Sequence, residues 1–437
     1  MHVLQKTINT ISSESSNINI EGLNSRYTHV CVFDSNASAN DKKHLQSSKI
    51  IAIDASQELT ITDSKKGLAE LQNFYNNRKG WLFGYLTYDL KNEIEQLDSK
   101  NDDGLKFPLL HFFSPKVVIQ IENNSTAIFY DDGFISESEA TEIYQFALSK
   151  SITKNESISQ TDIQSKITKQ EYTNAVNQLK QHIRKGDIYE VNFCQEFFSK
   201  NAEINPVDVF EKLNAISEAP FSTFSKFGKH FLLCASPERF LKKQGSKLIS
   251  QPIKGTAKRS ANKLEDEQLK TQLRNNLKEK SENVMIVDLV RNDLSHIAKR
   301  GTVNVEELQT IYSFKQVHQM ISTVSCELKE SISFTDILKS TFPMGSMTGA
   351  PKISAMKLIE EFESTKRGLY SGAVGYISPN GDFDFNVVIR SILYNSENKY
   401  LSFMVGSAIT DKANAEQEYD ECLLKAKALF EVLQATN

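Results

Sequence analysis

The sequence predicts a protein of the α+β class, in which groups of consecutive strands alternate with amphipathic helices. Three apolar runs near the C-terminus, 372–377, 385–394 and 400–410, follow one another as strands, and Asn380-Gly381 is a hairpin signal between the first two. The segment that begins at Lys352 instead has apolar residues at positions i, i+3, i+4 and i+7, which is the spacing of a helix face. The last helix is predicted over 418–433.

The bulk properties are those of an ordinary globular protein. The 437 residues are 39% hydrophobic and 24% charged, with a net charge of −4. No basic field points to nucleic acid, and the longest apolar runs, such as 81–86, are too short to span a membrane. Five widely spaced cysteines without a Cys-x-x-Cys pair and a polar N-terminus without an apolar signal region predict a cytoplasmic protein with reduced thiols.

The chain divides into two parts at a polar segment. Residues 151–166 contain almost no large apolar side chains and are predicted to be a linker between an N-terminal α/β part, 1–150, and a second domain, 167–437. Strands are expected at 27–33 and 49–53.

Further elements are predicted on both sides of this linker. A helix is expected at 68–75, and a buried strand at 81–89 contains Gly84 at a bulge or a close backbone approach. Beyond the linker, a helix is capped by Thr168 and stops at Gly186 before a strand at 188–198. The helix that begins at Lys352 is predicted to end at Gly368.

A single lysine is a candidate nucleophile. Lys254 lies between Pro252, which fixes its own φ, and Gly255, which permits unusual backbone angles, so the lysine is placed on a stiff strand-to-turn element. Such a lysine is either an exposed surface amine or a positioned nucleophile, and the segment alone favours the surface amine.

Three glutamates form a candidate metal site. On the last helix Glu418, Glu421 and Lys425 lie at the edge of the apolar stripe, and Glu282 shares a helix face with Ile286. Carboxylates that point inward suit a hard cation such as Mg²⁺. The alternatives are an exposed Glu421–Lys425 pair and a surface or capping role for Glu282.

Several segments could bind an anion. Thr348 precedes a helix start, where it offers either a simple cap or a site with free N–H groups, and Arg390 ends an apolar run and needs an acidic partner. Gly406 and Ser407 stand at a strand end, where backbone amides can approach a carboxylate. Together these signals indicate a small polyanion held with a divalent cation.

Six motifs in order resemble the chorismate-binding enzyme family, which includes anthranilate, isochorismate, salicylate and aminodeoxychorismate synthases. The resemblance covers roughly 165–437, and the N-terminal part is similar only loosely, through 81–89. The motifs are Pro252-Ile253-Lys254-Gly255-Thr256, Asp288-Leu289-Val290-Arg291-Asn292-Asp293-Leu294, Gly345-Ser346-Met347-Thr348-Gly349-Ala350-Pro351-Lys352, Arg367-Gly368-Leu369-Tyr370-Ser371-Gly372, Val374-Gly375-Tyr376 and Glu418-Tyr419-Asp420-Glu421.

This resemblance implies a fold and a set of site residues. The expected fold has two packed antiparallel β-sheets with helices on the outer faces. The expected cofactor is Mg²⁺, with Glu282 and Glu421 as ligands and Glu418 close by through water. The expected substrate is chorismate, with Glu238 as proton donor to the departing C4 hydroxyl. The residues that match substrate-binding positions are Thr256, Tyr376, Arg390, Lys425 and the amides around Gly406.

Lys254 distinguishes between members of the family. Members with alanine at this position aminate C2 of chorismate directly, whereas a lysine can add to C2 so that ammonia then enters at C4. The resemblance therefore implies conversion of chorismate and ammonia to 4-amino-4-deoxychorismate for folate synthesis, with ammonia supplied by a glutamine amidotransferase subunit. The lysine would need a lowered pKa to react. Anthranilate or isochorismate/salicylate synthesis is the alternative.

The sequence departs from the family pattern at several positions. Gln319 stands where members often have histidine, and the role of that histidine does not pass to His318, because neighbours on a regular element face apart. Val405 and Ser407 replace two glycines, and Val32-Phe33-Asp34-Ser35 is the nearest match to the Leu-Leu-Glu-Ser of tryptophan-binding relatives. These changes motivate a remote alternative, a non-catalytic chorismate-binding regulatory subunit.

Overall fold

A computed structural model describes residues 5–11, 18–36, 48–63, 65–78, 80–122, 125–150, 161–315 and 317–434. Its strands form one antiparallel network that branches at β5 (Leu110–Glu122) into two sheets. The first runs β3 (Ser48–Ile61), β2 (His29–Asp34), β9 (Phe221–Phe227), β10 (His230–Ser236), β19 (Ser391–Asn395), β20 (Tyr400–Ile409) and β8 (Glu190–Ser199). The second runs β4 (Leu82–Leu86), β17 (Ala373–Ile377), β18 (Phe383–Val387), β11 (Arg239–Gln244), β12 (Lys247–Gln251) and β15 (Val317–Glu327), which also pairs with β13 (Ile253–Lys258) and β14 (Asn304–Ser313).

Short strands complete the network at its margins. β6 (Ser125–Asp131) and β1 (Gln5–Ile11) extend it from β5, while β7 (Gln164–Ser165) and β16 (Gly349–Ala350) pair with β8. The expected pair of antiparallel sheets is confirmed, with the two sheets joined through β5.

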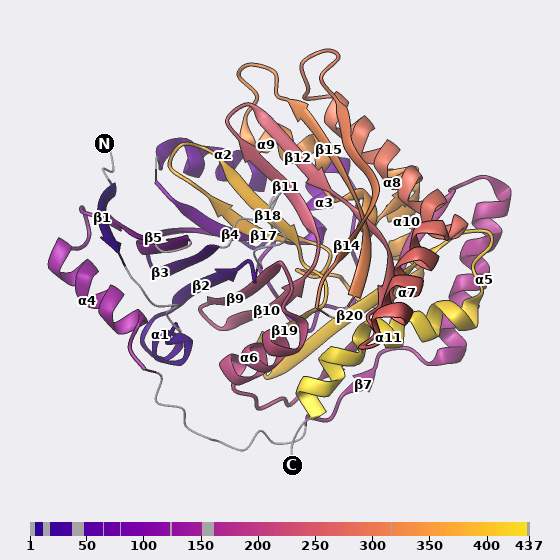
Figure 1. The fold of residues 1–437 in the computed structure, drawn as a ribbon, viewed down its shortest axis with the longest axis horizontal. Helices are drawn as coiled ribbons and strands as arrows, with labels where there is room; N and C mark the ends of the chain where they lie inside the picture. The colour runs from indigo at the N-terminus through magenta and orange to yellow at the C-terminus, as the bar shows by residue number, and fades with distance from the viewer. Residues whose placement is uncertain are drawn as a thin grey trace.

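Helices lie on the outside of the sheets (Figure 1). Against the first sheet pack α1 (Ile20–Arg26), α4 (Glu137–Ala147), α5 (Lys169–Lys185), α6 (Pro206–Ser217), α10 (Lys352–Phe362) and α11 (Ala415–Gln434). The second core includes side chains of α2 (Gly67–Asn77), α8 (Leu277–Ser295) and α9 (Phe334–Thr341). Four shorter or peripheral elements are η1 (Tyr88–Leu90), α3 (Lys91–Glu95), α7 (Lys263–Asn275) and η2 (Gly345–Met347). No described helix is both long and apolar enough to cross a membrane.

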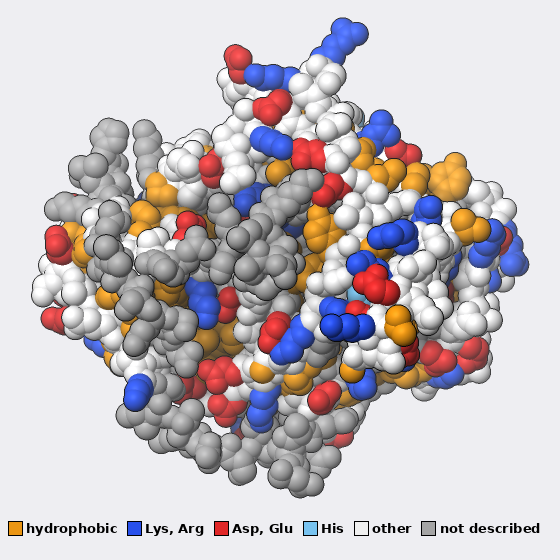
Figure 2. All heavy atoms as spheres, in the orientation of Figure 1, with side chains coloured by type: hydrophobic (Ala, Val, Ile, Leu, Met, Phe, Trp, Pro, Cys, Tyr) orange, Lys and Arg blue, Asp and Glu red, His pale blue; other side chains and the backbone are white. Residues whose placement is uncertain are grey.

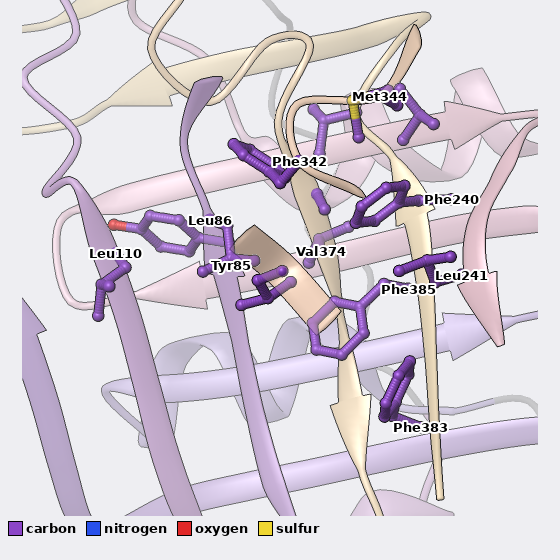
Figure 3. Close-up of a cluster of buried hydrophobic side chains, with 14 of the residues drawn as sticks. Tyr85, Leu86, Leu110, Phe240, Leu241, Phe342, Met344, Val374, Phe383 and Phe385 are labelled. Atoms are coloured by element: carbon purple, nitrogen blue, oxygen red, sulfur yellow. The ribbon is translucent and has the colours of Figure 1, made fainter. Parts of the chain in front are cut away.

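Strand alternation divides the apolar side chains between two cores. Val30 and Val32 of β2 point into the core beneath the helices of the first sheet, whereas Cys31 between them points into the other core. Figure 3 shows part of this second core, where Phe240, Val374 and Phe385 from the second sheet pack with Phe342 and Tyr85. Both cores combine residues from before and after the predicted linker.

The two parts of the chain also share strand pairs. β2 pairs with β9, and β4 pairs with β17. Gly84 in β4 is in register with both Phe112 and Gly375, and a Cβ there would lie 2.1 Å from the carbonyl oxygen of His111. The predicted close approach is confirmed, without a bulge at this position. Within the predicted linker, residues 151–160 lie outside the described residues, and Gln164–Ser165 form β7.

Several predicted boundaries are confirmed and others are wrong. Thr168 caps α5 in a capping box with Glu171, and Gly186 ends the helix with φ +86°. The helix that begins at Lys352 ends at Phe362 rather than at Gly368, because Glu363 is already extended at its C-cap. The single strand predicted at 385–394 is two strands, β18 and β19, with Arg390 in the break at φ +51°.

Charges are mixed on the surface. Figure 2 shows acidic and basic side chains interspersed over the face in view, without a continuous patch of either sign. This distribution agrees with the net charge of −4 and gives this face no broad basic field.

Candidate active site

Lys254 is buried on β13 and forms an ion pair with a strand of the other sheet. Its Nζ donates to Oε1 of Glu190 on β8 at 2.6 Å, and the two residues are 8% and 1% exposed. Gly255 beside it has φ +89° where the register of β13 with β15 shifts, which explains the glycine at this irregular point of the strand. The surface-amine interpretation of Lys254 is therefore wrong.

The electrostatic environment of Lys254 differs from the expected one. Burial lowers the pKa of this amine, but the carboxylates of Glu190, Glu282 and Glu238 outweigh burial and raise it above its usual value. The expectation of a lowered pKa is wrong for the free protein. A lysine held as an ammonium must lose a proton before it can act as a nucleophile. Glu190, which is in direct contact with Lys254, can accept this proton.

Glu238 is a fully buried carboxyl group just before β11. Burial raises its pKa to about 7, against the opposing effects of Ser346, whose Oγ donates to Oε1 at 2.5 Å, and of Lys254. A carboxyl group with a pKa near 7 is substantially protonated at neutral pH and can serve as a general acid. The alternative of a salt bridge to Arg239 is not what the structure shows, because Arg239 instead bonds Asp384 at 2.9 Å.

A buried arginine fixes the loop that carries Ser346. The Arg367 guanidinium forms an ion pair with Glu363 at 2.6 Å and donates to the backbone oxygens of Met347 and Asn192 at 2.5 and 2.7 Å. These bonds tie η2 to β8, the strand of Glu190. The loop therefore holds the partner of Glu238 in a defined position.

The predicted metal ligands lie on two helices, α8 and α11. Glu282 and Glu418 are buried, at 6% and 2% exposure, and the Lys278 ammonium lies 3.9 and 2.9 Å from their carboxylates. Burial raises the pKa of Glu282 to about 7. Glu421 is more exposed and pairs with Lys425 at 2.7 Å, so the alternative of an i, i+4 pair holds for these two residues.

Two observations on these glutamates fit a cation. Oε1 of Glu282 and Oε2 of Glu418 are buried without a hydrogen-bond partner, and Lys278 already places a positive charge between the two carboxylates. The fit is not that of a preformed cage. Among the described residues, the oxygens of Glu282, Glu418 and Glu421 do not all lie within 4.8 Å of one another.

Carboxylates outnumber cations in this region. We call the acidic residues the carboxylate cluster; its members are Glu190, Glu238, Glu279, Glu282, Glu418 and Glu421. The cations that act on them are Lys254, Lys278, Lys425 and Arg390. An added dication would lower the cost of burying the remaining negative charge.

Arg390 lies in the break between β18 and β19. Burial lowers its pKa and Glu238 opposes this effect, yet within the described ranges no carboxylate lies within 4.0 Å of its guanidinium. A positive φ at a non-glycine residue is uncommon and often accompanies a functional constraint. Glu238 is therefore the acidic group that acts on Arg390, without a direct ion pair between them.

Gln319 and His318 are neighbours on β15 and differ in their hydrogen bonding. His318 is buried between Ser313 and Asp266, at 2.8 and 3.1 Å, whereas Oε1 of buried Gln319 has no hydrogen-bond partner. The inference that His318 cannot replace the missing histidine agrees with these contacts. Thr256 on β13 is in register with Gln319 and is exposed.

Three residues predicted to bind an anion, Thr348, Gly406 and Ser407, have different surroundings in the structure. Thr348 is fully buried and does not cap α10, because Pro351 occupies the N-cap position, so the capping interpretation is wrong. The carbonyl of Gly406 accepts from Lys425 at 2.9 Å. The Ser407 hydroxyl is 3.0 Å from the Tyr172 hydroxyl and lies inside the helix-covered core.

Tyr376 is not brought to Lys254. Its ring packs against Phe33, Trp81 and Phe83, and it lines a separate pocket together with Asp34 and Arg239. Successive side chains of β17 point to opposite faces of the sheet, so a residue in the matched motif can face away from the other site residues, as this ring does. Phe33, Asp34 and Ser35 of the 32–35 segment line the same pocket.

Sequence reasoning missed four side chains of the site. Glu190 could have been noticed, because a charged residue in the apolar run 188–193 requires a partner. Ser346, Lys278 and Glu279 gave no such signal, since each belongs to a polar or glycine-containing stretch that is typical of turns and exposed helix faces.

Comparison with known proteins agrees with this geometry. The model of the chorismate binding enzyme family matches residues 24–431. The chain is a member of this family. It is 33% identical to an anthranilate synthase component I-like protein of Synechocystis over 81% of this chain and 73% of that protein. It is 31% identical to aminodeoxychorismate synthase component 1 of Bacillus subtilis over 84% of this chain and 79% of that protein.

Solved structures share the fold. Anthranilate synthase component I of Streptococcus pneumoniae superimposes with a TM-score of 0.79 at 24% identity, covering 96% of this chain and 100% of that chain. The chain is therefore a chorismate-utilising enzyme by family. Relatives with different products have similar identities, so the choice among products depends on the site residues.

Proposed function

We propose that this protein acts as component I of an aminodeoxychorismate synthase. The observation that carries the proposal is the burial of Lys254, whose ammonium is 2.6 Å from the Glu190 carboxylate. Lys254 also interacts electrostatically with Glu238, a carboxyl group that can be protonated at neutral pH. A surface lysine would have no reason to be desolvated among carboxylates. A nucleophilic lysine requires both a proton acceptor and an acid for the leaving group.

The first half of the reaction forms a covalent intermediate. Glu190 accepts a proton from the Lys254 ammonium, and the free amine adds to C2 of chorismate. The ring double bond shifts, the C4–O bond breaks, and Glu238 protonates the departing oxygen to give water. Burial of Glu238 keeps this proton available at neutral pH.

The second half transfers nitrogen to C4. Ammonia adds at C4, the double bond shifts back, and the C2–Nζ bond breaks to release Lys254 as an amine. The product is 4-amino-4-deoxychorismate. Ammonia would come from a glutamine amidotransferase partner, as the designation "component 1" of the relatives suggests for those proteins.

The remaining residues bind and orient the substrate in this proposal. Arg390 has no carboxylate partner among the described residues and suits one carboxylate of chorismate. Glu282, Glu418 and Glu421 would hold Mg²⁺, which would supply positive charge for the other carboxylate. Displacement of Lys278 from the two buried glutamates would accompany Mg²⁺ binding.

Anthranilate synthesis is the second candidate, because anthranilate synthases match at similar identity. In that case ammonia attacks C2 directly and Lys254 serves only as a counter-ion of Glu190. The two candidates predict different products from the same reactants.

Product analysis with chorismate, Mg²⁺ and ammonium separates the two candidates. We expect 4-amino-4-deoxychorismate from the wild type and none from Lys254→Ala, with Lys258→Ala as control on the exposed end of the same strand. Anthranilate as the wild-type product, or full retention of the 4-amino product in Lys254→Ala, would refute the proposal.

Glu190→Gln keeps a hydrogen-bond partner but removes the proton acceptor, so its kcat should fall by about 100-fold or more.

A further inference from the structure

A second group of ionisable side chains lies on the N-terminal strands. We call His29, Glu58 and His111 the imidazole cluster. One ligand atom from each residue lies within 4.8 Å of the others. Oε2 of Glu58 is 3.0 Å from Nε2 of His29 and 4.0 Å from Nε2 of His111. The carboxylate therefore stands close to one nitrogen of each imidazole.

Strand register brings these residues together. His111 of β5 is directly opposite Thr60 of β3, so Glu58 is its diagonal neighbour on the same face of the sheet. A register shift between Ala55 and Gln57 bends β3 just before Glu58. His29 begins β2, the strand on the other side of β3.

Both imidazoles are oriented through their other nitrogen. Nδ1 of His111 is 2.8 Å from the Thr60 hydroxyl, and Nδ1 of His29 is 3.1 Å from the Thr28 hydroxyl. In each ring Nε2 is thus the nitrogen left for a ligand. A hydrogen bond at the distal nitrogen is the usual support of a metal-binding histidine.

His111 supplies an independent sign that something is bound here. The residue is 5% exposed, and its Nε2 has no hydrogen-bond partner. A buried polar atom without a partner is costly and calls for a ligand.

We propose that His29, Glu58 and His111 bind one divalent transition-metal ion of the Zn²⁺ class. Two imidazoles and one carboxylate suit Zn²⁺ and not Mg²⁺, which prefers oxygen ligands. Tetrahedral Zn–N bonds of about 2.1 Å place ligand atoms about 3.4 Å apart. Around the ion, His29 and Glu58 would therefore move slightly apart from 3.0 Å, and Glu58 and His111 would move closer from 4.0 Å. Half-exposed Glu58 opens the site to solvent and leaves the fourth position to water.

The bound ion would clamp three strands. It joins β2, β3 and β5 at the point where the two sheets meet. A ligand that binds only the folded chain stabilises it by mass action. The site therefore has a structural role, separate from the elements that carry Lys254.

Calorimetric titration tests the proposal. Full-length protein, treated with chelator and then kept in saturating Mg²⁺, is titrated with Zn²⁺, and its melting temperature is measured in parallel. We expect one Zn²⁺ per chain, a rise in melting temperature, and at least tenfold weaker binding in both Glu58→Gln and His111→Gln. Glu58 is exposed, so its variant keeps the fold even where the His111 variant does not.

The control is His182→Gln, which removes a partly exposed histidine paired with Asp187 elsewhere in the chain. Its Zn²⁺ affinity should equal that of the wild type. The proposal is overturned by absence of Zn²⁺ binding in the wild type, by unchanged affinity in Glu58→Gln, or by an equal loss in the control. Adventitious surface binding would give the second of these results.

Discussion

The carboxylate cluster and the imidazole cluster differ in which ionisable groups are buried and in the direction in which burial shifts their pKa values. Around Lys254 the glutamates are buried in excess over cations, and burial raises the pKa of Glu238 and Glu282 to about 7. In the imidazole cluster the carboxylate, that of Glu58, is half exposed, while burial lowers the pKa of both imidazoles. In the two proposals, the first region transfers protons and holds a hard cation, and the second binds a metal ion through imidazole nitrogens.

The strongest test of this contrast is loss of the acid in the carboxylate cluster. Glu238→Gln keeps the size of the side chain and the hydrogen bond from Ser346 but removes the proton. We expect kcat to fall by about 10²–10⁴-fold in a chorismate amination assay. A variant with wild-type kcat would exclude Glu238 as the acid.

Removal of one of the proposed metal ligands should give the next largest effect. Glu421→Gln lowers the negative charge that faces Lys425 and Lys278 and that would face the proposed cation. We expect the Mg²⁺ concentration for half-maximal activity to rise by about 10-fold or more, because charge count sets the affinity of oxygen sites. Activity measured against Mg²⁺ concentration checks this, and an unchanged curve would contradict the metal assignment.

The buried carboxylates should cost stability. The pKa of Glu238 is about 7 in the folded chain against 4.5 ordinarily, so its contribution to stability is present below pH 4.5 and is lost as pH rises through about 7. Glu238→Gln should therefore raise the free energy of unfolding by up to about 3 kcal/mol at pH 8 and by nearly nothing at pH 4. Denaturant unfolding at the two pH values measures the difference. An equal effect at both would show that ionisation of this group is not the cause.

The corresponding change in the imidazole cluster should be small. Without metal, Glu58→Gln removes one half-exposed carboxylate from His29, and exposed pairs contribute about 0–1 kcal/mol. We expect the free energy of unfolding of the metal-free protein to change by less than about 1 kcal/mol. A larger loss of stability would mean that Glu58 stabilises the metal-free protein through its contact with His29, and this would contradict a role as a metal ligand alone.

Local sequence signals predicted much of the fold. The cap at Thr168, the stop at Gly186 and the close approach at Gly84 each follow from the chemistry of one residue and its neighbours. The break at Arg390 was missed because the apolar run continues on both sides of it, so periodicity contains no sign of a left-handed residue there. The end of α10 was misplaced because no glycine marks it.

The site was predicted less completely than the fold. Motif matching found Lys254 and Glu238, which the structure places in one electrostatic group. It could not find the Lys254–Glu190 contact, because β13 and β8 belong to different sheets and their approach depends on packing. It also grouped Tyr376 with the substrate-binding residues, although that ring faces another pocket.

The pairing of β4 with β17 and of β2 with β9 has a consequence for how the chain can be divided. A fragment that starts at residue 167 would retain the motifs of the family but expose the edges of both β9 and β17. Unpaired strand edges of this kind recruit other chains and promote aggregation. The N-terminal part of the chain thus covers strand edges that segment 167–437 would otherwise expose.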